Sequence, residues 1–103
     1  PEDLRAPADE VAGGLRQIQT IATGVVSAGT DSDAAKAQVE KIEPVWQGIE
    51  GTVKANDEDA YVSFEDSFAL LEKAAEEGDV TRAQEGSADV AQAVGAYLAE
   101  YPG

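Results

Sequence analysis

A chain of 103 residues has room for one domain with a single hydrophobic core. Its 21 acidic and 7 basic residues give a net charge of −14, which disfavours nucleic acid as a partner and favours cations and basic proteins. Histidine and cysteine are absent, which excludes disulfides, thiolate ligands and the serine–histidine triad, so we do not expect an enzyme. No run approaches the roughly 20 apolar residues of a membrane span, so we expect no direct membrane insertion. The chain begins at Pro1 and has no methionine, which is typical of a processed mature protein or an excised domain.

The first of four segments with helical periodicity covers residues 7–28. Pro7 suits a first helical position, and Gly29 is a typical residue to end the helix. Three glycines within the segment, at positions 13, 14 and 24, each weaken it by roughly 1 kcal/mol relative to alanine. Apolar residues that step by four and three mark its buried face: Val11, Leu15, Ile18, Ala22 and Val25.

A second helix is predicted over residues 32–55, where the apolar residues follow a 4-3-4-3-4 spacing typical of a bundle. These residues are Ala35, Val39, Ile42, Trp46, Ile49 and Val53. Pro44 lies inside this segment and cannot donate a hydrogen bond to the carbonyl of Glu40. We therefore expect the helix to kink there.

The third and fourth helices are predicted over residues 58–77 and 80–101. Gly78 ends the third helix and Asp79 caps the fourth, and so short a connection makes the two helices antiparallel neighbours. The buried face of the third helix is predicted to contain Tyr61, Phe64, Phe68, Leu71 and Ala75. That of the fourth is predicted to contain Ala83, Ser87, Val90, Val94, Leu98 and Tyr101.

These four segments predict an all-α fold in which residues 1–103 form one domain, an up-down-up-down antiparallel four-helix bundle. No segment shows the alternation of a β-strand. The alternative is a three-helix core to which the first helix is only loosely attached.

Two rows of glutamates flank the connection between the second and third helices. Glu43 and Glu50 are seven residues apart with Trp46 between them, and Glu65 and Glu72 repeat this spacing on the third helix. Seven residues are two helical turns, so each pair lies on one face. Folding brings the two rows together or places them on opposite sides, and the sequence leaves both arrangements open.

If the rows converge, carboxylates and a phenol make a hard-oxygen site of the kind that ferric iron, calcium, magnesium and manganese prefer. Glu50 and Glu65 would then be the central ligands, with Glu43 and Tyr61 as the next candidates. In the alternative interpretation the glutamates are ordinary boundary residues, solvated or paired with lysines at positions 36, 54 or 73. Trp46 and Tyr61 are expected to pack in the core, with polar tips that orient a neighbouring carboxylate.

The same hairpin contains a Trp-x-x-Ile-Glu helix followed by Tyr-x-x-Phe-Glu, in residues 46–50 and 61–65. It resembles the soluble helical segment that accompanies bacterial FTR1-type iron permeases, and it is more loosely similar to iron-uptake lipoproteins of the imelysin type. The resemblance covers roughly residues 42–72. The membrane helices of the permease, with their Arg-Glu-x-x-Glu motif, are absent here.

This resemblance implies an accessory domain of a metal-uptake system that delivers or senses iron. The domain would be extracytoplasmic, that is periplasmic, secreted or tethered to the outside of a membrane. Its partner would be a membrane iron permease or another basic protein, and transport itself would belong to another chain or to a missing part. The alternative is an acidic helical interaction module without metal or catalysis, in which Pro44, Gly48 and Gly51 let another helix pack closely.

Overall fold

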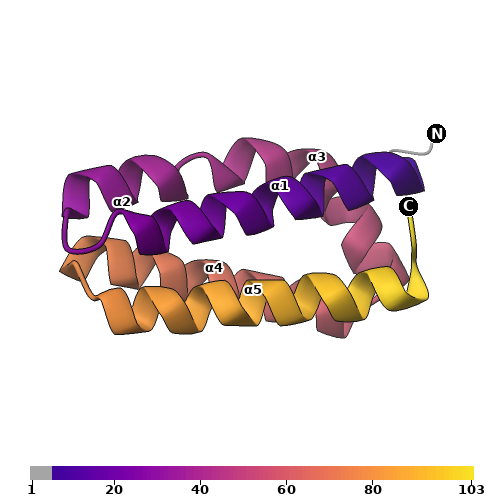
Figure 1. The fold of residues 1–103 in the computed structure, drawn as a ribbon. Helices are drawn as coiled ribbons and strands as arrows, with labels where there is room; N and C mark the ends of the chain where they lie inside the picture. Colours follow the sequence, from indigo (N-terminus) through magenta and orange to yellow (C-terminus); the bar gives the residue numbers. More distant parts are fainter. Residues whose placement is uncertain (1–5) are drawn as a thin grey trace.

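The computed structural model describes residues 6–103, and within that part of the chain every regular element is an α-helix. The helices are α1 (Ala8–Ser27), α2 (Ser32–Val39), α3 (Ile42–Asn56), α4 (Glu58–Glu77) and α5 (Val80–Glu100). They form four rods, because α2 and α3 follow one another along a single rod (Figure 1). The predicted all-α class is confirmed. Among the described residues, no helix has the length and apolar character to cross a membrane.

The helix predicted over residues 32–55 is not continuous. It is interrupted at Glu40 and Lys41, and Pro44 becomes the third residue of α3. A proline there leaves the Glu40 carbonyl without a helical donor, and its ring excludes a regular preceding turn. The backbone N–H of Lys41 donates instead to the carbonyl of Gln38, at 3.0 Å, which tightens the end of α2. The prediction of a disturbance at Pro44 was therefore right, but its form is a break rather than a kink.

Short polar residues define the helix boundaries. Asp31, Asp57 and Asp79 cap α2, α4 and α5, and each side chain accepts from the backbone N–H three residues on, at 3.0–3.1 Å. Gly29 and Gly78 follow α1 and α4 with φ of 64° and 62°, a left-handed conformation that favours glycine.

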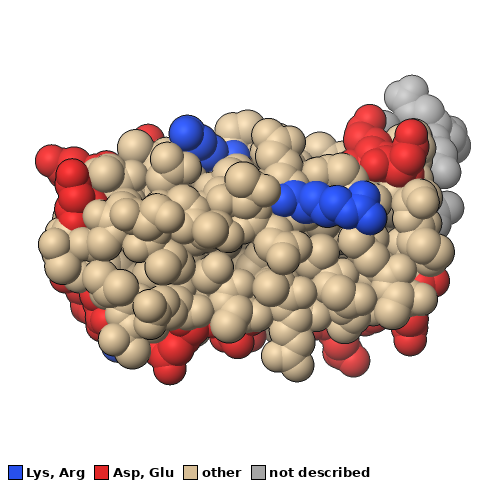
Figure 2. Space-filling model, viewed as in Figure 1, with Lys and Arg blue, Asp and Glu red and all other residues tan. Residues whose placement is uncertain are grey.

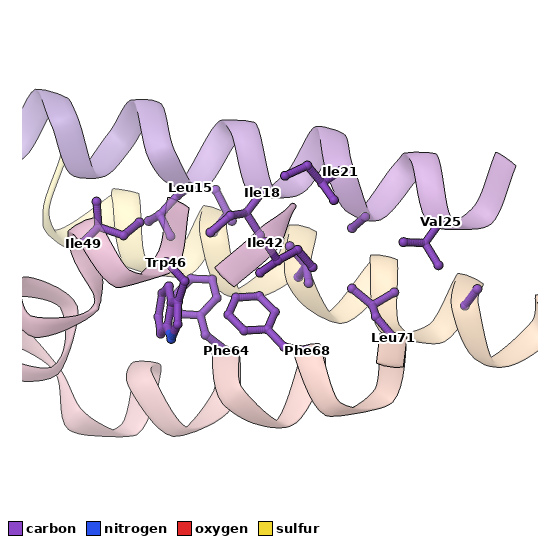
Figure 3. Close-up of a cluster of buried hydrophobic side chains, with 14 of the residues drawn as sticks. Leu15, Ile18, Ile21, Val25, Ile42, Trp46, Ile49, Phe64, Phe68 and Leu71 are labelled. Atoms are coloured by element: carbon purple, nitrogen blue, oxygen red, sulfur yellow. The ribbon is translucent and has the colours of Figure 1, made fainter. Parts of the chain in front are cut away.

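Helix α1 is an integral part of the core. All five residues of its predicted apolar face are between 0 and 2% exposed, so the alternative of a loosely attached first helix was wrong. Leu15 and Ile18 point from α1 toward the aromatic side chains of α3 and α4 (Figure 3). Gly14 allows α1 to approach α3, because a Cβ at this position would lie only 3.0 Å from Cδ1 of Ile49.

The buried face of α5 differs in part from the prediction. Ser87, Leu98 and Tyr101 are only half-buried, whereas Gly86 and Tyr97 are buried. A Cβ on Gly86 would lie 2.9 Å from Cδ2 of Leu71, so α4 and α5 are in close contact there. Gly86 was missed because a glycine adds nothing to an apolar pattern.

The end of α5 is tied to neighbouring elements. Asn56, the last residue of α3, donates from Nδ2 to the hydroxyl of Tyr97 at 3.0 Å, and the hydroxyl of Tyr101 donates to the Asn56 carbonyl at 2.8 Å. Beyond α5 the chain runs back toward α1 (Figure 1), and a Cβ on Gly103 would lie 3.1 Å from the Ala8 carbonyl oxygen.

Candidate functional site

The centre of the α3–α4 contact is an aromatic cluster around Trp46. The indole ring is 1% exposed, and its centroid lies 5.3 Å from that of Phe64 and 5.0 Å from that of Phe68. The Tyr61 ring stacks on its other side, at 5.9 Å. These contacts arise because Trp46 of α3 and three residues of α4, spaced by three and four, face each other across the hairpin (Figure 3). The expected packing of Trp46 in the core is therefore confirmed, whereas Tyr61, predicted to be buried with it, is only half-buried.

One carboxylate is positioned by this cluster. The indole N–H of Trp46 donates to Oε2 of Glu65 at 2.6 Å, a short hydrogen bond to a charged acceptor. A buried indole N–H needs a partner, and here the partner comes from the surface edge of α4. The expectation that the polar tip of Trp46 orients a neighbouring carboxylate is confirmed by this contact.

Glutamates of both helices act electrostatically on the phenol of Tyr61. Burial raises the pKa of Tyr61 above its ordinary value, and the negative charges of Glu65, Glu50 and Glu43 raise it further. Three of the four glutamates in the two acidic rows, whose relative position the sequence left open, therefore lie near enough to Tyr61 for their charges to act on its phenol.

Lysines do not neutralise these carboxylates. Within residues 6–103, no salt bridge involves Glu43, Glu50 or Glu65. Lys54 lies over the Tyr61 ring, with Nζ 5.2 Å from the ring centroid, and Lys73 pairs with Glu77 at 3.7 Å. The charges around the phenol are thus those of three glutamates, offset in part by Lys54.

The arrangement is open rather than a closed ligand cage. In the described part of the chain, no three acidic side chains are gathered closely enough to hold a metal ion as they stand. Glu43 and Glu50 lie two turns apart on α3, and Glu65 accepts the hydrogen bond from Trp46. An ion bound by all of these residues would require their side chains to rotate inward, and Glu65 would have to leave the indole.

The fourth glutamate of the two rows, Glu72, belongs to a different feature. It lines a groove between the α2–α3 break and α4, which we call the break groove. This groove consists of two adjoining hollows of about 270 and 420 Å³ that share Val39, Glu40 and Glu72. The periodicity did not predict it, because a continuous second helix would have kept Val39 in the buried seam. The signal that could have indicated it is Pro44, four residues after Glu40.

The acidic charge is distributed unevenly over the molecule. Figure 2 shows the face formed mainly by α1 and α5, where the middle is largely uncharged and acidic side chains gather at the ends and the lower edge. This agrees with the sequence, because neither residues 11–30 nor residues 90–99 contain an aspartate or glutamate. Most carboxylates therefore belong to other parts of the surface, including the α2–α3 rod and α4.

Comparison with known proteins gives no relative for this chain: no protein-family model, no curated protein and no solved structure matches it.

Proposed function

We propose that this chain is an extracytoplasmic accessory domain of a metal-uptake system and that it binds iron as its cargo on the α3–α4 face. Two observations support the proposal: Trp46 of α3 donates to Glu65 of α4 at 2.6 Å, and the charges of Glu43, Glu50 and Glu65 act on the phenol of Tyr61. Carboxylate and phenol oxygens are hard ligands, which suit Fe³⁺ and the other hard cations. The net charge of −14 adds a field that concentrates cations near the surface.

The open arrangement suits a cargo that must be released. Glu50 and Glu65 would close on the cation from α3 and α4, and Glu43 and Tyr61 would supply further oxygens. Glu65 would exchange its 2.6 Å hydrogen bond with Trp46 for a bond to the metal. Loss of this hydrogen bond would lower the net affinity for the ion, and its return would favour release. The partner would be a membrane iron permease or another basic protein that receives or supplies the ion.

We also propose an up-down-up-down antiparallel topology for the four rods. The one-residue connection at Asp57 and the two residues Gly78 and Asp79 are short enough to favour antiparallel neighbours. Spin labels at the exposed Gly13 and Gly95 would test this arrangement, because antiparallel α1 and α5 bring these two positions near the same end of the bundle. Parallel helices would instead separate the two positions by about ten residues, roughly 15 Å, along the bundle axis, and a label-to-label distance lengthened by that amount would contradict the proposal.

The metal proposal is tested by titrating the chelator-stripped protein with citrate-buffered Fe(III), with calcium and zinc as comparators. Calorimetry gives the stoichiometry, and the emission of Trp46 reports the release of Glu65, because Trp46 is the single tryptophan of the chain. We expect saturable binding that favours iron. The double variant Glu50→Gln/Glu65→Gln should weaken this binding by at least about tenfold, since each lost charged ligand contributes roughly 1 kcal/mol or more.

The matched control is Glu85→Gln/Glu100→Gln, which removes two exposed carboxylates of α5 and changes the net charge by the same amount. This variant should bind iron as the parent does. Equal binding by the parent and the Glu50/Glu65 variant would show that the site is wrong. Weak, unsaturable uptake of all three ions would leave the acidic interaction module, without metal or catalysis, as the better proposal.

A further inference from the structure

We infer that the break groove is a docking site for a basic segment of a partner protein, one that presents a single apolar side chain between lysine or arginine residues. This inference does not rest on the metal-binding proposal, and the two sites share only Glu43. The argument has two parts, the apolar floor of the groove and the charge of its rim.

The floor is apolar because the helical seam is interrupted there. Ile42 and Phe68 line one hollow, Ala75 lines the other, and Val39 lines both. Val39 is the only member of the predicted 32–55 seam that is half-buried rather than buried. The break at Glu40 thus leaves an apolar side chain at the surface beside two hollows, so a ligand with an apolar group would bury additional apolar surface there.

The rim is acidic on both sides. Glu40 and Glu43 lie on the side of the α2–α3 rod, and Glu72 and Glu76 lie on α4. Lys36 is the one basic residue among those described that line the groove, and none of the four glutamates forms a salt bridge within residues 6–103. Lysine or arginine residues on either side of an apolar side chain would complement this pattern. A bare cation or a polyamine would satisfy the rim but leave the half-buried Val39 uncovered.

The test uses the full chain in the presence of a chelator and a blocked pentapeptide of sequence lysine-lysine-leucine-lysine-lysine as the probe. Binding is followed by NMR titration of the isotope-labelled protein. We expect shifts concentrated in residues 36–43 and 68–76. A peptide with serine in place of leucine should bind at least about fourfold more weakly, the equivalent of one buried methylene group or more.

Two double variants distinguish binding in the break groove from attraction by the overall negative charge. Glu40→Gln/Glu72→Gln should weaken binding of the leucine peptide about three- to tenfold, in keeping with two partly exposed charge pairs. Glu10→Gln/Glu85→Gln changes the net charge equally at exposed positions outside the groove and should have little effect. An equal loss in both double variants would overturn the inference. So would equal affinity for the leucine and serine peptides, because attraction would then be by charge alone. The NMR spectra of the free variants confirm that each is folded.

Discussion

Two glycines of α5 face opposite environments, and replacing each with alanine should change stability in opposite directions. Gly95 is exposed, and a Cβ there would meet nothing within 4 Å. Gly95→Ala therefore removes a poor helix former without a steric cost and should stabilise the protein by about 0.8–1 kcal/mol. Gly86 is buried, and its Cβ would lie 2.9 Å from Cδ2 and 3.0 Å from Cγ of Leu71.

The cost at Gly86 depends on whether Leu71 can move. This leucine is fully buried, so its side chain has little room to turn away from the new Cβ. Overpacking of this kind costs about 1–3 kcal/mol, which exceeds the gain of about 1 kcal/mol in helix propensity in most of that range. We therefore expect Gly86→Ala to be destabilising by up to about 2 kcal/mol, and to differ from Gly95→Ala by about 1–3 kcal/mol.

Urea denaturation, followed by far-ultraviolet circular dichroism, gives both free energies of unfolding. For a domain of this size, each kcal/mol also corresponds to roughly 4–8 °C in Tm. The parent and the two variants should share one m-value, because the surface exposed on unfolding does not change. If Gly86→Ala stabilises the protein as much as Gly95→Ala does, the close α4–α5 contact at Leu71 is not as described.

Three further changes test individual contacts. Glu65→Leu removes the acceptor of the Trp46 indole N–H and should lower the free energy of unfolding by about 1–3 kcal/mol. Glu65→Gln keeps an acceptor and should lower it less. Urea denaturation and tryptophan emission of the two variants measure the difference. The pKa of Tyr61 is raised above its unfolded value of about 10, so the folded state holds this proton more tightly. The resulting stability is complete below pH 10 and is lost as the pH rises through the folded pKa. Tyr61→Phe should remove the part of the alkaline loss due to this phenol. If the difference between the phenolate absorbance titrations of parent and variant shows that the lost phenol titrates at its ordinary pKa of about 10, the assignment is refuted. Asp57→Ala removes the cap of α4 and should lower the free energy of unfolding by about 0.5–2 kcal/mol in urea denaturation. Asp59→Ala, at an exposed position in the same turn, should lower it by no more than a few tenths of a kcal/mol.

Local patterns predicted the helices well, because each one depends on residues close together in the sequence. The apolar spacing of α1 identified five residues that are all buried, and the aspartate caps and glycine stops set most boundaries correctly. The break in the second helix was harder to place, because Pro44 acts on the carbonyl of a residue one turn earlier. On α5 the periodicity selected Leu98 rather than Tyr97, since both fit a helical stripe and only the rotation of α5 against its neighbours decides between them.

The composition of the candidate site could be predicted from the sequence, but its geometry could not. The residue types and spacing of the glutamates were visible in the sequence, but which of them lie near Tyr61 depends on how α3 and α4 are rotated about their own axes. That rotation is set by the packing of Trp46 against Phe64 and Phe68, which is a tertiary property. The break groove depends on tertiary structure as well, since it forms only where α4 lies beside the break between α2 and α3. The apolar periodicity alone predicts one continuous helix there.

The contact between Gly103 and the first turn of α1 means that the polypeptide almost closes into a ring. A short flexible linker could therefore join residue 103 to residue 6, and new ends could be opened at the left-handed Gly29 or Gly78, where the backbone already turns sharply between helices. Such a circular permutant keeps every helix and every core contact, but α1 and α5 become neighbours in sequence and the two rods at the opened loop no longer are. Comparing its folding rate with that of the parent would show how far the speed of folding depends on bringing α1 and α5, the two most distant helices in the chain, together.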